Sequence, residues 1–334
     1  MDIDYIHKNY GIQMSETKTI DNYQCFYSNG LLYIVVPVHE QEQDEIVERY
    51  YMSKYLHKRG EKYIPRYVKR KDGYYISKWR EQYFLLVKLT SWRNEPYRNT
   101  AKKLAYFHMR GSEFPQVNQL SRYGEWNTYW ETRLEQLENF WRSLVYQKPE
   151  NEFEKMFIES FPYYAGLTEN AIQFYVDTLQ DVQPSIQDVG TITHIRFRPE
   201  TWSNHFVWKN PFEWVFDHPS RDLAEWSRHL YLEKPQTYTY QLQLYFQNYQ
   251  SVYNLSPYFL RLLFSRLLFP LHYFECMEEY MVNRTNERSH FLKNKLKYFL
   301  ENSEGYEYFL TTFFEKLQIP TRTYQIPPIE WLRK

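Results

Sequence analysis

The middle of this 334-residue chain holds two short stretches, Thr193-His194-Ile195-Arg196-Phe197-Arg198-Pro199 and Phe216-Asp217-His218-Pro219-Ser220-Arg221-Asp222-Leu223-Ala224. The first lies within a span of residues 184–219 that shows no helical periodicity, and the second begins at the end of that span. Asp222 stands just before an apolar-periodic segment, and a carboxylate in that place is typical of a helix N-cap, here for residues 223–230. The span therefore interrupts a helical region with an irregular loop.

Hydrophobic residues on both sides of this loop recur with the period of an amphipathic helix. The predicted helices cover residues 97–109, 126–146, 152–161, 168–179, 222–230, 238–253, 257–281, 287–300 and 307–317. The most apolar stretch, residues 258–274, carries Arg261, Arg266 and His272 and is shorter than the ~20 residues that cross a membrane. It predicts a buried amphipathic helix and no membrane span.

The N-terminal part of the chain predicts a small β-rich unit. Its predicted elements are a helix over 2–9, strands over 12–20, 22–27 and 31–38, a helix over 39–59, and strands over 66–70 and 74–79. Asn29-Gly30 and Asp72-Gly73 are hairpin signals between neighbouring strands. After the opening helix, the expected order is three strands, a helix and two strands.

The composition excludes several functional classes. Only 9 glycines occur, against a usual ~7% of residues, whereas Trp, Tyr and Phe make up 20%. So few glycines disfavour folds built on repeated glycine loops, and so many aromatics disfavour disorder. Lys plus Arg and Asp plus Glu number 41 each, so no global charge draws the chain to nucleic acid or to a membrane surface. Cys25 and Cys276 predict neither a disulfide framework nor a metal site.

Three motifs resemble those of aminoglycoside-phosphotransferase-like kinases. Leu104-Ala105-Tyr106-Phe107-His108 is similar to the L-A-x-x-H helix of that family. The stretch at 193–199 sits where the family carries its catalytic loop, H-G-D-x-x-P-x-N, and the stretch at 216–224 is similar to its P-x-x-D-L-A segment. The Asp-His-Pro-Ser-Arg-Asp-Leu run most resembles the kinase-like spore coat proteins of the CotS and YutH type.

The resemblance implies an α+β, bilobal protein-kinase-like fold. A small β-rich N-lobe would cover residues 1–90, and a larger, mainly helical C-lobe would cover 91–334, with a degenerate catalytic loop at about 190–220. His194 would order that loop, Asp222 would brace it through backbone N–H groups, and His108 would pack between helices. For Asp222, a plain N-cap role is equally compatible.

The first lobe lacks the residues that contact ATP phosphates in such a kinase. That chemistry needs phosphate contacts from a turn, a lysine from the third strand, a general base, and Asn and Asp ligands for Mg²⁺. The first turn, residues 19–23, contains no glycine, and Val36 occupies the region of the lysine. Glu42, Glu45 and Glu48 are candidates for the helix glutamate that would pair with it.

The catalytic loop also departs from the family pattern. Aligned on His194, the general base falls at Arg196, whose guanidinium stays protonated and accepts no hydrogen bond. The metal asparagine falls near Thr201, and Asn204 stands three residues too late for it. Arg196 and Arg198 are candidates for a pair that binds an anion in the old cleft, and the alternative is that they pair with nearby acids or face solvent.

The metal aspartate has two candidate positions. Asn210 keeps the family's spacing to Pro219 and Asp222, but its amide has no charge for a divalent ion. A shifted register would place Asp217 there instead. Under either register the lysine and the base are absent, which predicts a pseudokinase.

We therefore expect a non-catalytic protein with no catalytic residues, no metal and no cofactor. The resemblance implies a structural or assembly role in a sporulating bacterium. The protein would be made in the mother-cell cytoplasm and then join the spore coat, with other coat proteins as partners. The alternative is an active ATP-dependent small-molecule phosphotransferase with displaced catalytic residues, in which Asp188 and Asp217 hold the metal.

Overall fold

The computed structural model describes residues 3–20, 22–39, 42–92, 98–115, 117–202, 207–283 and 285–329. Asn204 lies outside these residues. The chain splits into two compact units, which we call the N-terminal unit (Met1–Ser121 with Gly190–Asp217) and the C-terminal unit (Arg122–Val189 with His218–Lys334). This grouping assigns residues 91–121 and 190–217 to the unit that holds the larger sheet. The lobe boundary at residue 90 stays a prediction.

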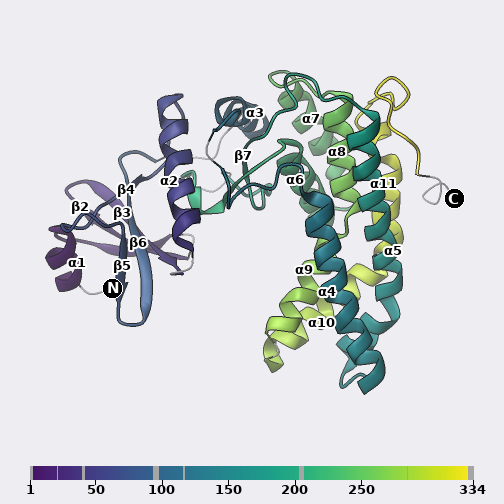
Figure 1. The fold of residues 1–334 in the computed structure, drawn as a ribbon, viewed down its shortest axis with the longest axis horizontal. Helices are drawn as coiled ribbons and strands as arrows, with labels where there is room; N and C mark the ends of the chain where they lie inside the picture. The colour runs from purple at the N-terminus through teal and green to yellow at the C-terminus, as the bar shows by residue number, and fades with distance from the viewer. Residues whose placement is uncertain are drawn as a thin grey trace. The chain divides into compact units, whose positions relative to one another are not determined.

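The N-terminal unit is built on an antiparallel sheet of six strands (Figure 1). Its elements are α1 (Ile3–Tyr10), β1 (Thr17–Ile20), β2 (Tyr23–Ser28), β3 (Leu31–Val38), α2 (Gln43–Lys58), β4 (Arg66–Tyr67), β5 (Ile76–Trp79), β6 (Gln82–Leu89), α3 (Thr100–Gly111), β7 (Thr191–His194), η2 (Pro211–Glu213) and β8 (Trp214–Asp217). The sheet order is β1-β2-β3-β6-β4, and β5 also pairs with β6. Asn29 and Gly30 both take positive φ in the turn from β2 to β3, as a tight hairpin requires.

Strand β6, which pairs with β3, β4 and β5, is absent from the elements predicted from the sequence. The turn that precedes it contains Arg80, which takes a positive φ of 54°. Because neither glycine nor asparagine stands at that turn, the usual hairpin signal is absent from the sequence. The expected order of three strands, a helix and two strands is therefore wrong by one strand.

Each face of this sheet packs against a helix from the same unit. On one face Val36 of β3 lies in a cluster with Ile46 of α2 and with Trp208. On the other face Val35 lies in a cluster with Ile6 of α1. Neighbouring residues of β3 thus point to opposite faces, as the two-residue period of a strand requires.

Strands β7 and β8 form a separate antiparallel pair beside α3. Two glycines allow this close packing. A Cβ atom on Gly190 would lie 2.3 Å from the ring of Phe216, and one on Gly111 would lie 2.8 Å from Thr191 Oγ1. Both distances are too short for a side chain, so these glycines let α3 and the two strands approach one another.

The C-terminal unit is helical among its described residues. Its helices are α4 (Trp126–Gln147), α5 (Glu152–Asp181), α6 (Ser220–Glu233), α7 (Tyr238–Gln250), α8 (Pro257–Leu268), α9 (Leu271–Val282), α10 (Asn286–Glu301) and α11 (Ser303–Lys316). The two longest, α4 and α5, lie side by side (Figure 1), and α5 also contacts α8 and α10.

Two helix predictions in this unit are wrong. Residues 152–181 form one helix, because Phe161 and Tyr164 stay buried on its packed face and the helix continues through Pro162. Residues 257–281 form two helices instead of one. Pro270 lacks a backbone N–H and forces Phe269 into extended geometry, which ends α8.

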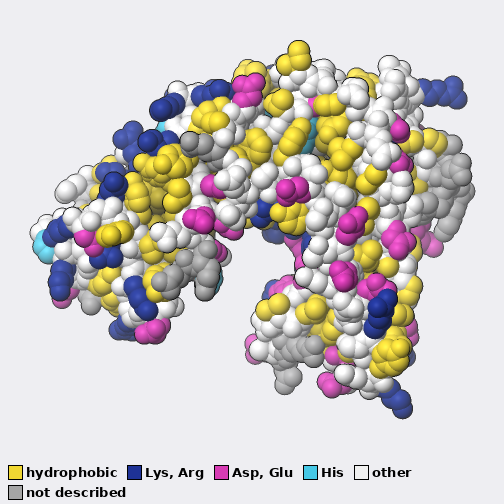
Figure 2. Space-filling view, viewed as in Figure 1, with side chains coloured by type: hydrophobic (Ala, Val, Ile, Leu, Met, Phe, Trp, Pro, Cys, Tyr) yellow, Lys and Arg dark blue, Asp and Glu magenta, His cyan; other side chains and the backbone are white. Residues whose placement is uncertain are grey.

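Side chains of both charge signs occur on the visible face of each unit (Figure 2), in keeping with the formal net charge of 0. Among the described residues, none of the helices combines the length and apolarity needed to cross a bilayer.

Candidate functional site

A cavity of about 610 Å³ lies in the N-terminal unit. Its described lining residues are Asn22, Tyr23, Pro37, His194, Glu200, Thr201, Trp202, Val207, Trp208, Asn210 and Glu213. The lining is aromatic and acidic: it includes two carboxylates and no Lys or Arg among these described residues. We call it the β3–β7 cavity, after two of the strands that contribute to it.

The structure brings together three of the five positions that the sequence assigned to degenerate kinase chemistry. His194, Thr201 and Asn210 line the β3–β7 cavity, whereas Val36 and Arg196 are not among its lining residues. The three lining positions come from the end of β7 and from the loop that follows it. The end of β7 and this loop therefore share one cavity, and the kinase roles of these positions stay predictions.

The third strand presents no cation to the cavity. Val36 pairs with Leu85 of β6 and is only 2% exposed, so its side chain belongs to the sheet core. The next residue, Pro37, is exposed and lines the cavity. A proline ring offers neither a charge nor a hydrogen-bond donor to a phosphate group.

Asn210 is held by hydrogen bonds within the unit. Its Nδ2 donates to Tyr23 Oη at 3.1 Å and to Glu213 Oε1 at 3.2 Å. Its Oδ1 accepts from the backbone N–H of Phe212 at 3.1 Å and so caps η2. Asp217, the other candidate for the metal aspartate, lies on β8 opposite Thr191 and does not line the cavity.

Two buried tryptophans, Trp202 and Trp208, line the cavity, and we call them its aromatic floor. The buried ring of His194 lies 5.1 Å from the ring of Trp202 and 5.2 Å from that of Phe107. Trp202 has a φ of 64°, which is unusual for a bulky residue. Trp208 is also buried, and its ring meets Tyr23 edge to face at 5.7 Å.

An ion triad centred on the buried Glu61 lies beside this floor. The carboxylate of Glu61 pairs with the ammonium of Lys209 and, at 2.7 Å, with the guanidinium of Arg110. Lys209 Nζ also lies 4.4 Å from the ring centre of Trp202. Burial lowers the pKa of Lys209 to about 8, although Glu61 opposes that shift. Burial raises the pKa of Glu61, but the two cations outweigh it and hold that pKa below the usual carboxyl value.

The three candidate helix glutamates have other partners. Glu48 is buried and accepts three backbone N–H groups, those of residues 118–120, at 2.8 to 2.9 Å. Glu45 pairs with Arg49 at 2.9 Å, and Glu42 accepts the backbone N–H of His39 at 3.1 Å. α2 is thus tied to the loop after α3 through Glu48.

The structure does not bring Arg196 and Arg198 into the cavity as lining residues. Arg196 Nη1 donates to the backbone oxygen of Ile195 at 2.7 Å. The guanidinium of Arg198 lies 3.9 Å from the carboxylate of Glu200, and both side chains are about half exposed. This geometry agrees with the alternative in which Arg198 pairs with a nearby acid, and the anion site stays a prediction.

His108 and Asp222 are both fully buried. His108 lies on α3, and its backbone oxygen accepts the hydroxyl of Thr191 at 2.7 Å, which joins α3 to β7. Asp222 lies in the first turn of α6, which begins at Ser220, three residues before the start at Leu223 that an N-cap at Asp222 would require. The alternative in which Asp222 is a plain N-cap is therefore wrong, because Pro219 occupies the cap, and the loop-bracing role stays a prediction.

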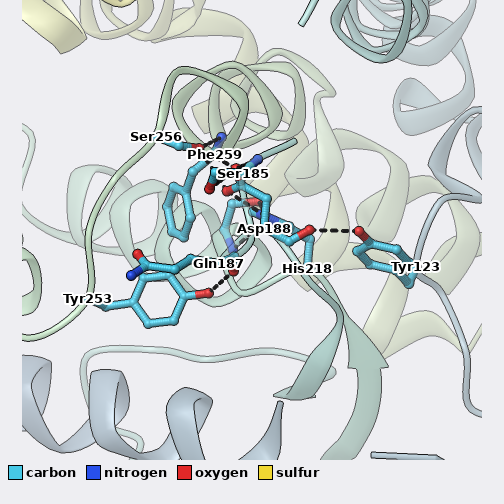
Figure 3. A network of polar contacts seen from close by, with 9 residues as sticks. Tyr123, Ser185, Gln187, Asp188, His218, Tyr253, Ser256 and Phe259 are labelled. Carbon is cyan, nitrogen blue, oxygen red and sulfur yellow. Dashed lines mark hydrogen bonds and ion pairs between the residues drawn. The ribbon is translucent and has the colours of Figure 1, made fainter. Parts of the chain in front are cut away.

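Asp188 is the centre of a polar network in the C-terminal unit (Figure 3). Its carboxylate accepts the hydroxyl and the backbone N–H of Ser185, both at 2.7 Å, and the hydroxyl of Ser256. Tyr123 donates to its backbone oxygen at 2.9 Å. Burial raises the pKa of Asp188, but hydrogen bonds from His218, Ser185 and Ser256 outweigh it and lower that pKa.

His218 completes this network. Its Nδ1 accepts the backbone N–H of Ser220 at 3.2 Å, so Nε2 carries the proton and faces Asp188 Oδ1 at 3.6 Å. Asp188 is the residue that the rival kinase hypothesis assigned to the metal. The described contacts of the Asp188 carboxylate hold the loop before β7 against other residues of the C-terminal unit.

Sequence reasoning missed the aromatic floor, the two carboxylates of the cavity and the triad. Trp202, Trp208, Glu200 and Glu213 stand in no recognisable motif, and Glu61 is 148 positions from Lys209. A pattern search has no signal for pairs so far apart. The one available hint was the density of aromatic residues in an otherwise irregular loop.

Known structures with a similar fold define the class of this protein. An aminoglycoside phosphotransferase from Alicyclobacillus acidocaldarius superposes with a TM-score of 0.64 at 12% identity, over 91% of this chain and 93% of that one. The spectinomycin phosphotransferase APH(9)-Ia, in complex with ADP and spectinomycin, gives a TM-score of 0.58 at 14% identity, over 90% and 92% of the two chains. The chain therefore has the α+β, protein-kinase-like fold of the aminoglycoside phosphotransferases, as the motifs implied.

The sequence comparison identifies the family within this class. Residues 3–313 match the family described as "Spore coat putative kinase YutH". The endospore coat-associated protein YutH of Bacillus subtilis is 39% identical over 335 residues, which cover 98% of this chain and 97% of that protein. The chain belongs to the YutH family, and the predicted resemblance is confirmed.

Proposed function

We propose that this protein is a non-catalytic, kinase-like component associated with the spore coat, with a structural or assembly role. Membership of the YutH family and the coat association in the name of the Bacillus subtilis relative support the location. It would be made in the mother cell and would join other coat proteins. Neither a metal nor a nucleotide is part of this proposal.

The lining of the β3–β7 cavity is the observation that carries the proposal. A kinase needs cations around the phosphates and carboxylates around Mg²⁺. Here the described lining contains no Lys or Arg, and two carboxylates would repel phosphate groups. At the position of the general base, Arg196 cannot accept a proton.

Lys209 does not substitute for the missing lysine in this proposal. It is buried, paired with Glu61 and absent from the cavity lining. Release of its ammonium group toward a ligand would leave the buried carboxylate of Glu61 with Arg110 alone, which is costly.

The second candidate is an active phosphotransferase with displaced catalytic residues. The observation that favours it is the fold itself, because the similar structures include phosphotransferases. Within the N-terminal unit such an enzyme would have to use Glu200 and Glu213 as metal ligands, since these are the carboxylates that line the cavity.

The two candidates differ in how they respond to nucleotide. We expect no change in melting temperature when ATP and Mg²⁺ are added together. A ligand present at about 100 times its Kd would stabilise the folded chain by about 2.7 kcal/mol, which is an easily measured shift.

Variants at the cavity make this test decisive. A shift that requires Mg²⁺ and disappears in Glu213→Gln would overturn the proposal and favour the phosphotransferase. Glu81→Gln, an exposed carboxylate in the same unit, is the matched control and keeps whatever response the unaltered chain has. A shift with ATP alone would indicate nucleotide binding without the metal that phosphoryl transfer needs.

A further inference from the structure

The longest stretch of this chain without a charged residue covers residues 235–260. Asp, Glu, Lys and Arg make up 25% of the whole chain, so a run of this length is unusual. It contains helix α7, whose residues all lack charge. The solvent side of an amphipathic helix normally carries charged residues, as α10 does with the exposed pair Lys297 and Glu301. The solvent side of α7 has no such group.

One side of α7 is packed and the other is open to solvent. Phe246, on the packed side, meets Phe313 of α11 edge to face at 5.9 Å. On the open side, residues four, seven and eleven positions after Tyr240 lie along one stripe of the helix surface. Tyr240 is 70% exposed and Leu244 is 45% exposed. We call the exposed residues of this stripe and its two edges the α7 face: Tyr240, Gln241, Leu244, Gln247, Gln250 and Ser251.

A second uncharged segment lies beside the C-terminal end of α7. Residues 182–187 carry no charge, and residues 183–187 are all exposed. Tyr253, which follows α7, donates its hydroxyl to the backbone oxygen of Gln187. The neighbouring Ile186 is 96% exposed, the highest value among the large hydrophobic residues that the structure describes. The uncharged surface therefore includes this loop as well as the helix.

The lack of charge restricts what this surface can bind. A membrane surface or a nucleic acid is held by Lys or Arg, and α7 has neither. A partner that covered the face with charged groups would lose their hydration and gain no counter-charge. An uncharged partner surface does not have this cost, and the same face on a second copy of the chain is such a surface.

The α7 face is also chemically suited to meet its own copy. In a two-fold dimer the residues nearest the axis meet themselves, so a charged residue there would oppose a like charge. Leu244 is the midpoint of α7, and antiparallel packing about an axis at Leu244 brings Gln241 opposite Gln247 of the other copy. A glutamine amide both donates and accepts hydrogen bonds, so two glutamines can pair, whereas two lysines or two glutamates cannot.

We propose that two copies of this protein associate through their α7 faces, about a two-fold axis at Leu244. The α7 face and residues 183–187 provide fewer residues than the about 20–30 a side of a standard interface. The association is therefore weak, with a Kd on the order of 10–100 μM. It goes beyond the proposed function and does not depend on it, because α7 contributes none of the described lining residues of the β3–β7 cavity.

Sedimentation equilibrium of the full chain between about 1 and 200 μM tests the inference. We expect the weight-average mass to rise with concentration from 41.5 kDa toward twice that value. Leu244→Glu places two like charges at the axis and should weaken the association about ten-fold or more. Val145→Glu on α4 is the matched control, because Val145 is 46% exposed, and it should change the association less than about two-fold.

A mixture of charge-reversed variants tests the symmetry. Leu244→Lys alone should weaken the association as Leu244→Glu does. An equimolar mixture of the two should recover it to within about three-fold of the unaltered chain, because opposite charges then meet at the axis. Three results would overturn the inference: a constant mass of 41.5 kDa up to about 200 μM, equal weakening by Val145→Glu and Leu244→Glu, or no recovery in a mixture of folded variants. The first would assign the α7 face to a different uncharged partner.

Discussion

Each unit of this protein buries one glutamate between two cations, and the two triads differ in one chemical respect. In the N-terminal unit Glu61 lies between Lys209 and Arg110. In the C-terminal unit Glu225 lies between Arg228, at 3.2 Å, and Arg266, at 2.9 Å. A lysine can release its proton when its partner is lost, but an arginine cannot.

The two triads also differ in the burial of their cations. Arg110 is 38% exposed, and burial has already brought the pKa of Lys209 down to about 8. Both arginines of the second triad are buried, and Arg228 also donates to the backbone oxygens of Arg266 and Phe269. Burial lowers the pKa of Arg228, but Tyr306 and Glu225 outweigh it, so this guanidinium stays charged. The N-terminal triad can therefore adjust its charge, and the C-terminal triad cannot.

The largest effect is expected for Glu225→Gln. It leaves two buried arginines without their carboxylate, and removing one partner of a buried ion pair costs about 3–5 kcal/mol. Urea unfolding at neutral pH measures this loss. Glu138→Gln, which breaks an exposed pair with Arg142 on α4, is the control and should cost less than about 1 kcal/mol. A loss below about 1 kcal/mol for Glu225→Gln would mean that the other partners of the two arginines compensate for the lost carboxylate.

The next effect is the acid sensitivity of His272 in the C-terminal unit. Burial, helped by Arg228 and Lys295, lowers the pKa of His272 from 6.5 to about 3. Below pH 6.5 the unfolded chain binds a proton that the folded chain does not bind. The free energy of unfolding therefore decreases as the pH is lowered. Between about pH 6.5 and 4.5 the loss from this group is about 2–3 kcal/mol.

His272→Phe should remove that slope. The ring of His272 already lies 4.8 Å from those of Phe299 and Tyr306, so a phenyl ring suits the site. The exposed His290 of α10 provides the control, and His290→Phe should keep the acid slope of the unaltered chain. An unchanged slope in His272→Phe would assign the acid sensitivity to another group.

Glu61→Gln should cost less than Glu225→Gln, about 1–2 kcal/mol. Once the carboxylate is lost, Lys209 can become neutral near pH 7, and because its pKa is already about 8 this adds only about 1 kcal/mol. The remainder comes from the lost hydrogen bonds. Urea unfolding of Glu61→Gln beside the exposed control Glu81→Gln measures the difference. A loss as large as that of Glu225→Gln would remove the distinction between the triads.

The smallest effect is an alkaline one. Between about pH 8 and 10.5 the folded chain releases the proton of Lys209 while the unfolded chain retains it, so the contribution of this group to stability rises with pH. The unaltered chain should therefore gain about 1 kcal/mol relative to Lys209→Met between about pH 8 and pH 9. Lys102→Met, an exposed lysine of α3, should show no such change. A constant difference between the unaltered chain and Lys209→Met would contradict the lowered pKa.

The family and the loop could be predicted from the sequence because their signals are local. The motifs ending at His108 and beginning near His194 each need only a few adjacent residues, and the family comparison confirms the resemblance that they carry. The predicted helix boundaries were wrong where tertiary packing outweighed a helix-breaking residue, as at Pro162 inside α5. Strand β6 was not predicted because the turn before it is made by Arg80 and contains neither glycine nor asparagine.

By itself, the sequence determined the kinase-like class and the absence of a lysine at Val36, since each depends on residue identity at a known spacing. The degenerate character of the loop stays a prediction. The tertiary structure alone decided what surrounds that loop. It placed Asn210 in the cavity and Asp217 on β8. It also brought Lys209 into an ion pair with Glu61, a residue 148 positions away in the sequence. Local patterns cannot specify such pairs, because desolvation and charge act between whichever side chains the fold brings together.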